Sequence, residues 1–248
     1  MADSKRKEQI LDFMRDKTFV TVDQLRDYLF VSGATVRRDL EELQNSRQIR
    51  RTRGGAVLVE GIANDAPLAI RESRNETQKM IIAGQACRLI KNGMTLFLDS
   101  SSTVFILARS LDQFTNLHVI TNSLKTALFL SDRKDIQVMC TGGTLRPGSK
   151  SLVGQAAVEY VSRFNADAAF MSARGFSAEN GASEASEDEC GVKRAFIKNS
   201  RQRYLLCDAS KMNVDYLCRI AALSQYDRVI TEDRQLNERF RSTTAITQ

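Results

Sequence analysis

The chain of 248 residues is poor in several residue types, and each shortage excludes a class of protein. It has one histidine and five cysteines that stand apart with no CxxC pair, so the sequence offers no credible zinc site. We expect the cysteines to be buried, reduced thiols, which are typical of a cytosolic protein. The N-terminal segment has no apolar run, so no secretory signal is expected there. No apolar stretch approaches the roughly 18 residues that a membrane helix needs.

Nucleotide-binding signatures are also missing. No GxGxxG occurs, and the segment from Gly143 to Lys150 resembles a P-loop but carries one extra residue before the lysine. The single histidine, His118, stands in the strand-like segment LHVIT, so we expect it to be packed rather than catalytic. The sequence therefore predicts no cofactor and no metal.

The composition itself describes a folded chain with a mild basic excess. Hydrophobic residues make up 42% of the sequence, which is enough for a proper core, and the formal net charge is +6 with a pI near 9.2. Such a charge is compatible with a nucleic-acid partner but does not demonstrate one.

Three short helices are predicted before residue 46, because apolar residues recur there at helical spacing. Thr21 and Ser32 are placed to cap the second and third helices. Only a short connection from Phe30 to Gly33 separates these two helices, which is the spacing of a helix-turn-helix. The three apolar faces consist of Ile10, Leu11, Phe13 and Met14, then Val22, Leu25 and Leu29, then Val36, Leu40 and Leu43.

A basic hairpin is predicted next. Two strands, at 49–52 and 56–59, are joined around Gly54-Gly55, and we expect both glycines to supply the positive φ angles of a tight turn. The segment from Arg47 to Arg53 holds four arginines and no acid. This hairpin is interpreted as the wing of a winged helix-turn-helix.

DNA binding is the function that this segment favours. The alternative is a small helical bundle with a solvated charged face, since residues 1–60 hold 12 Lys/Arg against 10 Asp/Glu, a net charge of only +2. The acids, however, gather on the first two helices, whereas the basic residues lie along one edge. The predicted DNA-binding residues are Ser32, Ala34, Thr35, Arg37, Arg38, Arg51 and Arg53.

Each of these contacts has an expected role. Thr35 and Arg38 would face base edges in the major groove, because arginine is suited to guanine. Arg37 and Ser32 would hold phosphates near the helix N-terminus, and the wing arginines would reach the backbone or the minor groove.

The rest of the chain alternates between strands and helices after a break in composition at residues 61–67. Such alternation predicts a parallel α/β sheet. The predicted domains are a DNA-binding domain at 1–58, a linker at 59–74 and an α/β domain at 75–248. The predicted strands are 94–98, 117–120, 136–140, 168–171, 204–207 and 228–231, and the predicted helices are 77–91, 102–110 and 123–130.

Polar loops follow three of the predicted strands. Ligands bind beyond the carboxyl ends of the strands in such sheets, and hydroxyls with free backbone N–H groups suit a phosphate. Each loop alone is better explained as a plain helix cap, but together they favour an anion-binding pocket. The loops are Asp99 to Thr103, Thr121 to Ser123 and Thr141 to Gly143, with Lys193 and Lys211 able to add positive charge. Residues 179–189 are expected to form a solvated loop or lid, and Glu189 is expected to pair with Lys193 four residues later.

Short motifs along almost the whole chain resemble the DeoR/GlpR family of bacterial transcriptional repressors. They are Val31-Ser32, Thr35 to Leu40, Gly54-Gly55-Ala56, Asp99 to Thr103, Thr121 to Ser123, Gly142-Gly143, Leu152 to Gly154, Glu189 with Val192-Lys193, and Asp208 to Lys211. The resemblance implies a C-terminal fold of the ribose-phosphate-isomerase and CoA-transferase type. It also implies a regulator of sugar catabolism whose effector is a phosphorylated sugar or a related metabolite.

The effector site expected from the loops and the resemblance has fifteen residues. They are Asp99, Ser100, Ser101, Ser102, Thr103, Thr121, Asn122, Gly142, Gly143, Arg174, Gly175, Glu189, Lys193, Asp208 and Lys211.

Two other classes of function stay open at this point. A sugar-phosphate isomerase could use Asp99, Glu187, Glu189 and Lys193 for acid/base work, but such an enzyme needs no DNA-binding module. A general nucleoid-type DNA binder would have neither an effector nor a preferred operator. A metabolite-sensing repressor explains both halves of the chain, and we expect it to form a dimer or tetramer through its C-terminal domain.

Overall fold

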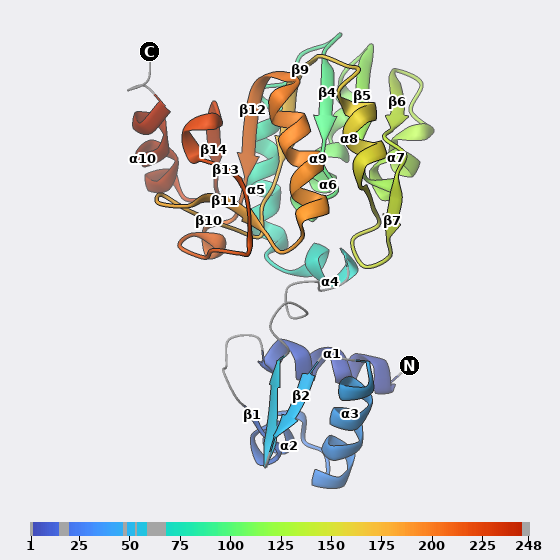
Figure 1. Ribbon diagram of the computed structural model, residues 1–248, viewed down its shortest axis with the longest axis vertical. Coiled ribbons are helices and arrows are strands. Elements are labelled where there is room, and N and C mark those ends of the chain that lie inside the picture. Colours follow the sequence, from blue (N-terminus) through green and yellow to red (C-terminus); the bar gives the residue numbers. More distant parts are fainter. Residues whose placement is uncertain (1, 15–19, 47–48, 53, 59–67, 245–248) are drawn as a thin grey trace. The chain divides into compact units, whose positions relative to one another are not determined.

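A computed structural model describes residues 2–14, 20–46, 49–52, 54–58 and 68–244 (Figure 1). The chain divides into two compact units, Met1–Ala66 and Pro67–Gln248. In the described ranges, no helix is both long and apolar enough to span a membrane.

The N-terminal unit is a winged helix-turn-helix, as predicted. Its three-stranded antiparallel sheet has the order β1-β3-β2, and the short strand β1 was not expected from the sequence. The elements are α1 (Ala2–Met14), β1 (Val20–Thr21), α2 (Val22–Leu29), α3 (Gly33–Asn45), β2 (Ile49–Thr52) and β3 (Gly55–Leu58).

The predicted caps and core of this unit are confirmed. The Thr21 hydroxyl accepts a hydrogen bond from the Gln24 backbone N–H, and the Gln24 side chain accepts one from Thr21, which completes a capping box. The Ser32 hydroxyl accepts from the Thr35 N–H at 3.1 Å. The buried core consists of Ile10, Met14, Val20, Leu25, Val36, Leu40, Leu43, Ile49 and Ala56.

The hairpin turn differs from the prediction at one glycine. Gly54 has a φ of +83°, as expected, but Gly55 is already the first residue of β3 and does not have a positive φ. Because Thr52 pairs with Gly55, the second glycine belongs to the strand ladder and not to the turn. Arg47 and Arg53 lie outside the described residues.

The C-terminal unit is built on a six-stranded parallel sheet in the order β14-β12-β9-β4-β5-β6. The six strands predicted from the sequence are the six strands of this sheet, with bounds that differ by a few residues. They are β4 (Thr95–Leu98), β5 (Leu117–Thr121), β6 (Ile136–Cys140), β9 (Ala166–Met171), β12 (Ser200–Leu206) and β14 (Arg228–Ile230).

Helices cover both faces of this sheet (Figure 1). Alternate residues of β4 point to opposite faces: Leu96 and Leu98 pack with one buried cluster, and Phe97 packs with the other. The first cluster includes residues of α5 (Glu76–Cys87), α6 (Ser102–Ala108) and α7 (Leu124–Ser131), and the second those of α8 (Gln155–Val161), α9 (Glu187–Lys198) and α10 (Arg234–Thr244).

A second, antiparallel sheet was missed from the sequence. It has the order β10-β11-β13, and a separate hairpin joins β7 (Thr144–Arg146) to β8 (Ser151–Val153). The solvated loop predicted at 179–189 is wrong, because β11 is buried and α9 begins at Glu187. Small residues in β11 produce no apolar alternation, and a Cβ on Gly181 would lie 2.2 Å from the Ala221 carbonyl oxygen. The strands are β10 (Gly175–Ser177), β11 (Gly181–Glu184) and β13 (Cys218–Ala221).

The C-terminal unit begins earlier than the predicted boundary at residue 75. Helix α4 (Leu68–Ser73) packs against α6, and its Leu68 is buried. The Lys125 ammonium reaches the Glu72 carboxylate at 2.6 Å, which also holds α4 in place. Residues 68–73 of the predicted linker therefore belong to the folded unit, and residues 59–67 lie outside the described residues.

Candidate DNA-binding surface and effector site

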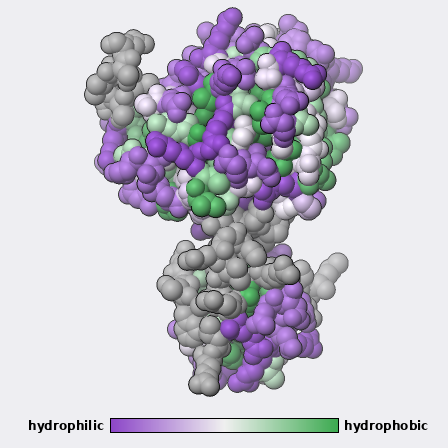
Figure 2. Space-filling view, in the orientation of Figure 1, coloured by the Kyte–Doolittle hydropathy of each residue, from purple (hydrophilic) through white to green (hydrophobic). Residues whose placement is uncertain are grey.

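Helix α3 buries one side and leaves its basic side in solvent. Ala34, Arg37 and Arg38 are exposed, and Thr35 is half-buried next to the exposed cap residue Ser32. The Arg38 guanidinium is 64% exposed and has the Glu42 carboxylate 3.9 Å away. On the face shown in Figure 2, the described surface of this unit is mostly hydrophilic. The outer side of α3 can thus present donors to the edges of bases or to phosphates.

A buried ion pair sets the position of α3. The Arg6 guanidinium of α1 donates to both oxygens of Asp39, at 2.5 and 2.9 Å, and Asp39 is fully buried. Two parallel hydrogen bonds fix orientation as well as distance. A second contact, from Lys7 to Glu42, joins the same two helices. Sequence reasoning missed this anchor, although the acid directly after Arg37-Arg38 was a signal for it.

The wing is joined to α3 by its backbone. The Arg51 N–H in β2 donates to the Gln44 side chain at 3.2 Å, and the Arg51 side chain is exposed. Arg53, the other predicted wing contact, lies outside the described residues. The structure thus brings Arg51 and the basic side of α3 into one unit.

The predicted effector residues gather at one edge of the parallel sheet. Asp99 follows β4, Thr121 ends β5 and Gly142 follows β6, and these three strands are neighbours. Arg174 follows β9, and Asp208 with Lys211 follows β12, again on adjoining strands. Because all the strands are parallel, their carboxyl ends meet at this edge.

The floor of this site is a buried charge network around Lys193. The Lys193 ammonium lies 3.2 Å from Asp99, 2.6 Å from Glu184 and 2.6 Å from the Ser172 carbonyl oxygen. Arg174 adds a second cation 3.5 Å from Glu184. The two carboxylates and two cations balance, so the network is satisfied within the fold.

The pKa values of this network follow from its pairing. Burial alone would lower the pKa of Lys193, but the carboxylates of Glu184 and Asp99 outweigh burial and hold it above its ordinary value. Burial would raise the pKa of Glu184, but Lys193 and then Arg174 hold it below its ordinary value. Both groups are therefore charged near neutral pH.

Glu189 has partners other than the one predicted. Its carboxylate accepts hydrogen bonds from the hydroxyls of Ser151 at 2.6 Å and Ser149 at 3.1 Å, and Ser100 lies 3.5 Å away. Lys193 pairs instead with Asp99 and Glu184, so the expected direct pair between Glu189 and Lys193 does not form. Helix α9 turns Lys193 toward β4 and β11, whereas Glu189 faces the loop before β8.

A second group of cations stands at the end of β12. The Lys211 ammonium donates to the Ser172 hydroxyl at 3.1 Å and the Ala173 carbonyl at 2.7 Å, which are neutral partners. Lys79 of α5 is buried nearby and donates to the carbonyls of Arg71 and Arg74. Burial, and then the charge of Lys211, lowers the pKa of Lys79 to about 8. An anion placed here would relieve the repulsion between these cations.

Asp208 is held at the same place by hydrogen bonds. Asn75 donates to it at 3.1 Å, and Ser210 also donates to it. Burial would raise the pKa of Asp208, but Lys211 and these hydrogen bonds hold it below its usual value. Sequence reasoning missed Lys79, Asn75 and Glu184, since nothing in their local sequence marks the distant contacts that the fold makes.

Two predicted residues carry buried polar atoms without a partner among the described residues. They are the Thr103 hydroxyl oxygen and the Asn122 side-chain oxygen, on side chains that are 0% and 1% exposed. Buried polar atoms are nearly always hydrogen-bonded, so each such exception needs an explanation. Thr103 lies in the first turn of α6, which follows the loop after β4, and Asn122 directly follows β5. Both orphan atoms therefore belong to the segments of the predicted site.

The remaining predicted residues differ in how they are placed. Gly142 and Gly143 are exposed at the rim, and Ser101 caps α6 through the Val104 N–H at 3.2 Å. Ser102 is buried in the first turn of α6. Gly175 is required for packing, because a Cβ there would lie 2.0 Å from the Val214 carbonyl oxygen.

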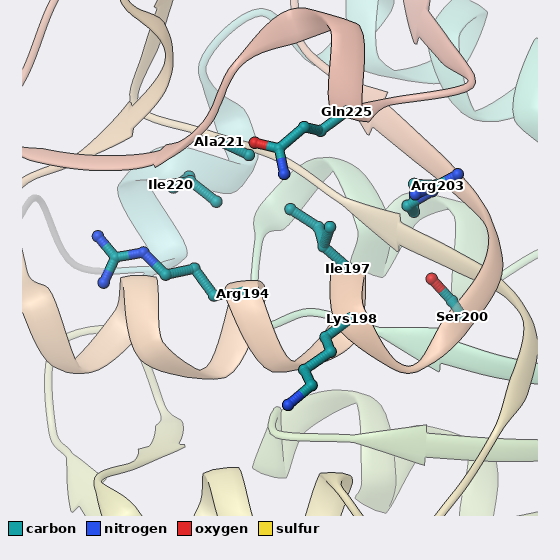
Figure 3. A pocket seen from close by; sticks show the side chains of 8 residues that line it. All are labelled: Arg194, Ile197, Lys198, Ser200, Arg203, Ile220, Ala221 and Gln225. Carbon is teal, nitrogen blue, oxygen red and sulfur yellow. The ribbon is translucent and has the colours of Figure 1, made fainter. Parts of the chain in front are cut away.

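A pocket of about 410 Å³ lies away from these residues (Figure 3). Ser200 and Arg203 line it from the early part of β12, whereas Asp208 follows the other end of that strand. The pocket is thus on the amino side of the sheet, opposite the predicted site. Its other lining residues are Arg194, Ile197, Lys198, Ile220, Ala221 and Gln225.

The winged helix-turn-helix and the polar strand-end site define a DNA-binding regulator with an attached sensor domain. Residues 6–61 match the DeoR-like helix-turn-helix domain, and residues 74–233 match the DeoR C terminal sensor domain. The chain therefore belongs to the DeoR family of transcriptional regulators and is a DNA-binding protein rather than an enzyme.

Three transcriptional regulators are similar in sequence to this chain over nearly its whole length. The HTH-type transcriptional regulator GolR of Listeria innocua is 35% identical over 93% of this chain and 91% of its own length. The HTH-type transcriptional repressor GlcR of Bacillus subtilis is 34% identical over 97% and 92%. The glycerol-3-phosphate regulon repressor of Escherichia coli is 31% identical over 94% and 92%.

Solved structures align with this chain at low sequence identity. The translation initiation factor eIF-2B of Pyrococcus horikoshii aligns with a TM-score of 0.50 at 14% identity, over 93% of this chain and 88% of that chain. A ribose 5-phosphate isomerase of Methanocaldococcus jannaschii aligns with a TM-score of 0.41 at 19% identity, over 56% and 55%. The predicted α/β class of the C-terminal unit is confirmed by the parallel sheet itself.

Proposed function

We propose that the chain represses a sugar-catabolism operon and leaves its operator DNA when a phosphorylated sugar or a related metabolite binds the strand-end site. The names of two relatives, a glycerol-3-phosphate regulon repressor and the repressor GlcR, support repression, and the first also supports a phosphorylated metabolite. For the effector to release the protein from DNA, it must bind the conformation with low DNA affinity more tightly than the conformation with high DNA affinity.

On the DNA side, the exposed face of α3 reads the operator. Thr35 and Arg38 contact base edges, Ala34 lies against the groove, and Ser32 and Arg37 hold phosphates at the start of the helix. Arg51 contacts the backbone from the wing, and Arg53 is proposed to act with it. The exposure of Ala34, Arg37 and Arg38 and the Arg6–Asp39 ion pair that positions α3 support this assignment.

On the effector side, the unpartnered oxygens of Thr103 and Asn122 carry the proposal. The Asn122 oxygen is an acceptor and suits a sugar hydroxyl, whereas the Thr103 hydroxyl can either donate or accept. A sugar phosphate supplies both kinds of partner. Lys211, whose hydrogen bonds go to neutral oxygens, then meets the phosphate, and Lys79 adds positive potential beside it.

The buried network has a different role in the same site. Asp99, Lys193, Arg174 and Glu189 are held by partners of their own, so we assign them to shaping the floor rather than to direct contact with phosphate. Ser100 to Ser102, Thr121, Gly142, Gly143, Gly175 and Asp208 supply the surrounding loops. The regulator works as a dimer or tetramer of identical chains in the bacterial cytosol, associated with the nucleoid when it is bound to DNA. Residues 59–67 serve as the linker.

A double variant tests the proposal. Thr103→Ala with Lys211→Ala is expected to bind operator DNA like the wild type but to ignore the inducing sugar phosphate. A thermal-shift screen of sugar phosphates on the wild type identifies the ligand, since a ligand at about 100 times its Kd stabilises the folded state by about 2.7 kcal/mol.

The matched control is Lys91→Ala with Thr115→Ala, two exposed residues near the amino ends of β4 and β5. It is expected to respond to the ligand as the wild type does. Normal release of the Thr103→Ala/Lys211→Ala variant from DNA would disprove the pocket assignment. Binding to all DNA sequences with equal affinity would point to a nucleoid-type DNA binder instead.

A further inference from the structure

The fold brings together three metal-ligating side chains that are far apart in the sequence. Glu187 and Cys190 stand three residues apart in the first turn of α9, and Cys218 begins the adjacent strand β13. One carboxylate oxygen and the two sulfurs all lie within 4.8 Å of one another. The sequence alone shows no clustered cysteines, because Cys218 lies 28 positions after Cys190.

The three atoms suit the coordination of one soft metal ion. A zinc–sulfur bond of about 2.3 Å in a tetrahedron separates two sulfurs by about 3.8 Å, and zinc–oxygen bonds are slightly shorter. Since all three atoms lie within 4.8 Å of one another, the two sulfurs exceed this spacing by no more than about 1 Å. Residues i and i+3 of a helix share one face, so Glu187 and Cys190 can turn together toward Cys218.

The surroundings allow an ion to reach the group. Cys190 is buried, Cys218 is half-buried and Glu187 is exposed, so the site is closed on the protein side and open toward solvent. The Cys190 thiol is 3.4 Å from the Cys218 carbonyl oxygen, which shows that helix and strand are already in contact. The fourth position of a tetrahedral ion would face the open side and hold water.

A neighbouring cation completes the charge balance. The Arg194 guanidinium binds the Glu187 carboxylate and also donates to the Arg219 carbonyl oxygen on β13. Two thiolates, one carboxylate and one guanidinium sum to a charge of −2, which a divalent ion neutralises. Arg194 can release Glu187 to the ion and keep its bond to Arg219.

We propose that Glu187, Cys190 and Cys218 bind one soft divalent metal ion, of the zinc or cadmium type, which fastens the first turn of α9 to β13. Thiolate ligands select such ions over magnesium or calcium. Each thiol loses its proton as the ion binds, so two protons are released to solvent per ion. This site is separate from the strand-end site and does not depend on the sugar-phosphate assignment.

The test is a titration of the reduced full chain with Cd²⁺ and with Zn²⁺, under a phosphine reductant that does not itself supply thiols. We expect one tightly bound ion per chain, a thiolate-to-cadmium charge-transfer band in the ultraviolet, and a higher midpoint of thermal unfolding. Cys218→Ser and Glu187→Gln are expected to weaken binding and to remove the thermal shift.

Two controls separate this site from other thiols. Cys87→Ser and Cys140→Ser change half-buried cysteines elsewhere in the fold and are expected to leave the titration unchanged. A cooperative thermal unfolding transition of each variant without metal shows that the variant is folded. Absence of binding with all thiols free, or equal binding by Cys218→Ser, would overturn the proposal, and so would binding without any thermal shift.

Discussion

The two units of the chain use charged side chains in different surroundings. On α3 of the N-terminal unit, Arg37 and Arg38 stand in solvent, whereas Lys193 and Glu184 of the C-terminal unit are buried and paired. Exposed charges keep their hydration until a phosphate or base replaces it, and they contribute little to folding. Buried charges are held by the fold, and removing one leaves its partner unpaired. The exposed charges of the first unit are therefore available for contacts with a partner, whereas the buried charges of the second are fixed by the fold.

Each unit also contains one exception to this contrast. In the N-terminal unit, Asp39 is fully buried against Arg6 and positions α3. In the C-terminal unit, Lys211 is half-buried and bonded to neutral oxygens. The buried Asp39 fixes α3 from behind its exposed face. The half-buried Lys211 places a cation beside the polar strand ends.

The largest effect is expected from the buried network. Lys193→Met would leave Asp99 buried without its cation and Glu184 with Arg174 alone, and the free energy of unfolding of the C-terminal unit should fall by about 3–5 kcal/mol. Urea unfolding followed by tyrosine fluorescence measures this, since four of the five tyrosines lie in that unit. Lys198→Met, an exposed lysine on the same helix, is the control and should change little. If both variants lost the same free energy of unfolding, the buried charges would contribute no more to stability than the exposed ones.

The next effect concerns recognition by α3. Arg38→Ala should weaken operator binding by about 1–3 kcal/mol at one base pair, whereas Arg51→Ala should weaken all sequences alike and reduce the salt slope by about 1. Mobility shifts against an operator selected from random DNA, with single base-pair changes, measure both. Arg88→Ala, an exposed arginine of the C-terminal unit, serves as the control. If neither variant changed affinity, the exposed face of α3 would not be the reading surface.

A smaller effect is expected from pH. The folded-state pKa of Lys79 is lowered to about 8, so the ammonium loses its proton as pH rises through that value. A phosphate-bearing effector should therefore bind up to about tenfold more weakly at about pH 9 than at about pH 7. Titration calorimetry at the two pH values measures the difference. Lys79→Met should bind equally at both, and an unchanged pH dependence in that variant would assign the titration to another group.

The smallest effect tests the turn of the helix-turn-helix. Phe30 ends α2 in the left-handed region, with φ +54° and ψ +41°, and its side chain is 93% exposed. Bulky residues are strained there and asparagine is tolerated, so Phe30→Asn should raise the free energy of unfolding of the N-terminal unit by about 1 kcal/mol. Thermal unfolding of the full chain, set beside Phe30→Ala, measures it. A larger gain in the alanine variant would mean that backbone strain is not the cause.

Much of the backbone could be predicted from local patterns. Thr21 and Ser32 mark helix starts because their hydroxyls satisfy N–H groups only three residues away. The apolar strands of the parallel sheet were visible as short runs between polar turns, since both faces of the sheet are covered. Strand β11 was missed because its Gly181, Ala182 and Ser183 are too small to form a recognisable pattern.

The site could be predicted only in part. Polar loops after β4, β5 and β6 were found because the carboxyl ends of parallel strands must meet at one edge. Partners such as Lys79 and Glu184 could not be found, since they come from elements whose packing no local spacing reveals. Glu189 shows the limit clearly: its spacing to Lys193 permits a pair along the helix, but Ser149 and Ser151 compete for the same carboxylate.

The sequence was enough to find the three helices of the N-terminal unit, the six strands of the parallel sheet, and the order in which a basic helix and hairpin precede an α/β domain. Those properties depend on neighbours within a few residues, and backbone periodicity expresses them directly. Only the tertiary structure decided that Arg6 holds Asp39, that Lys193 is shared by Asp99 and Glu184, and that Cys190 lies beside Cys218. Those contacts form when packed elements exclude water and force distant polar groups to satisfy one another.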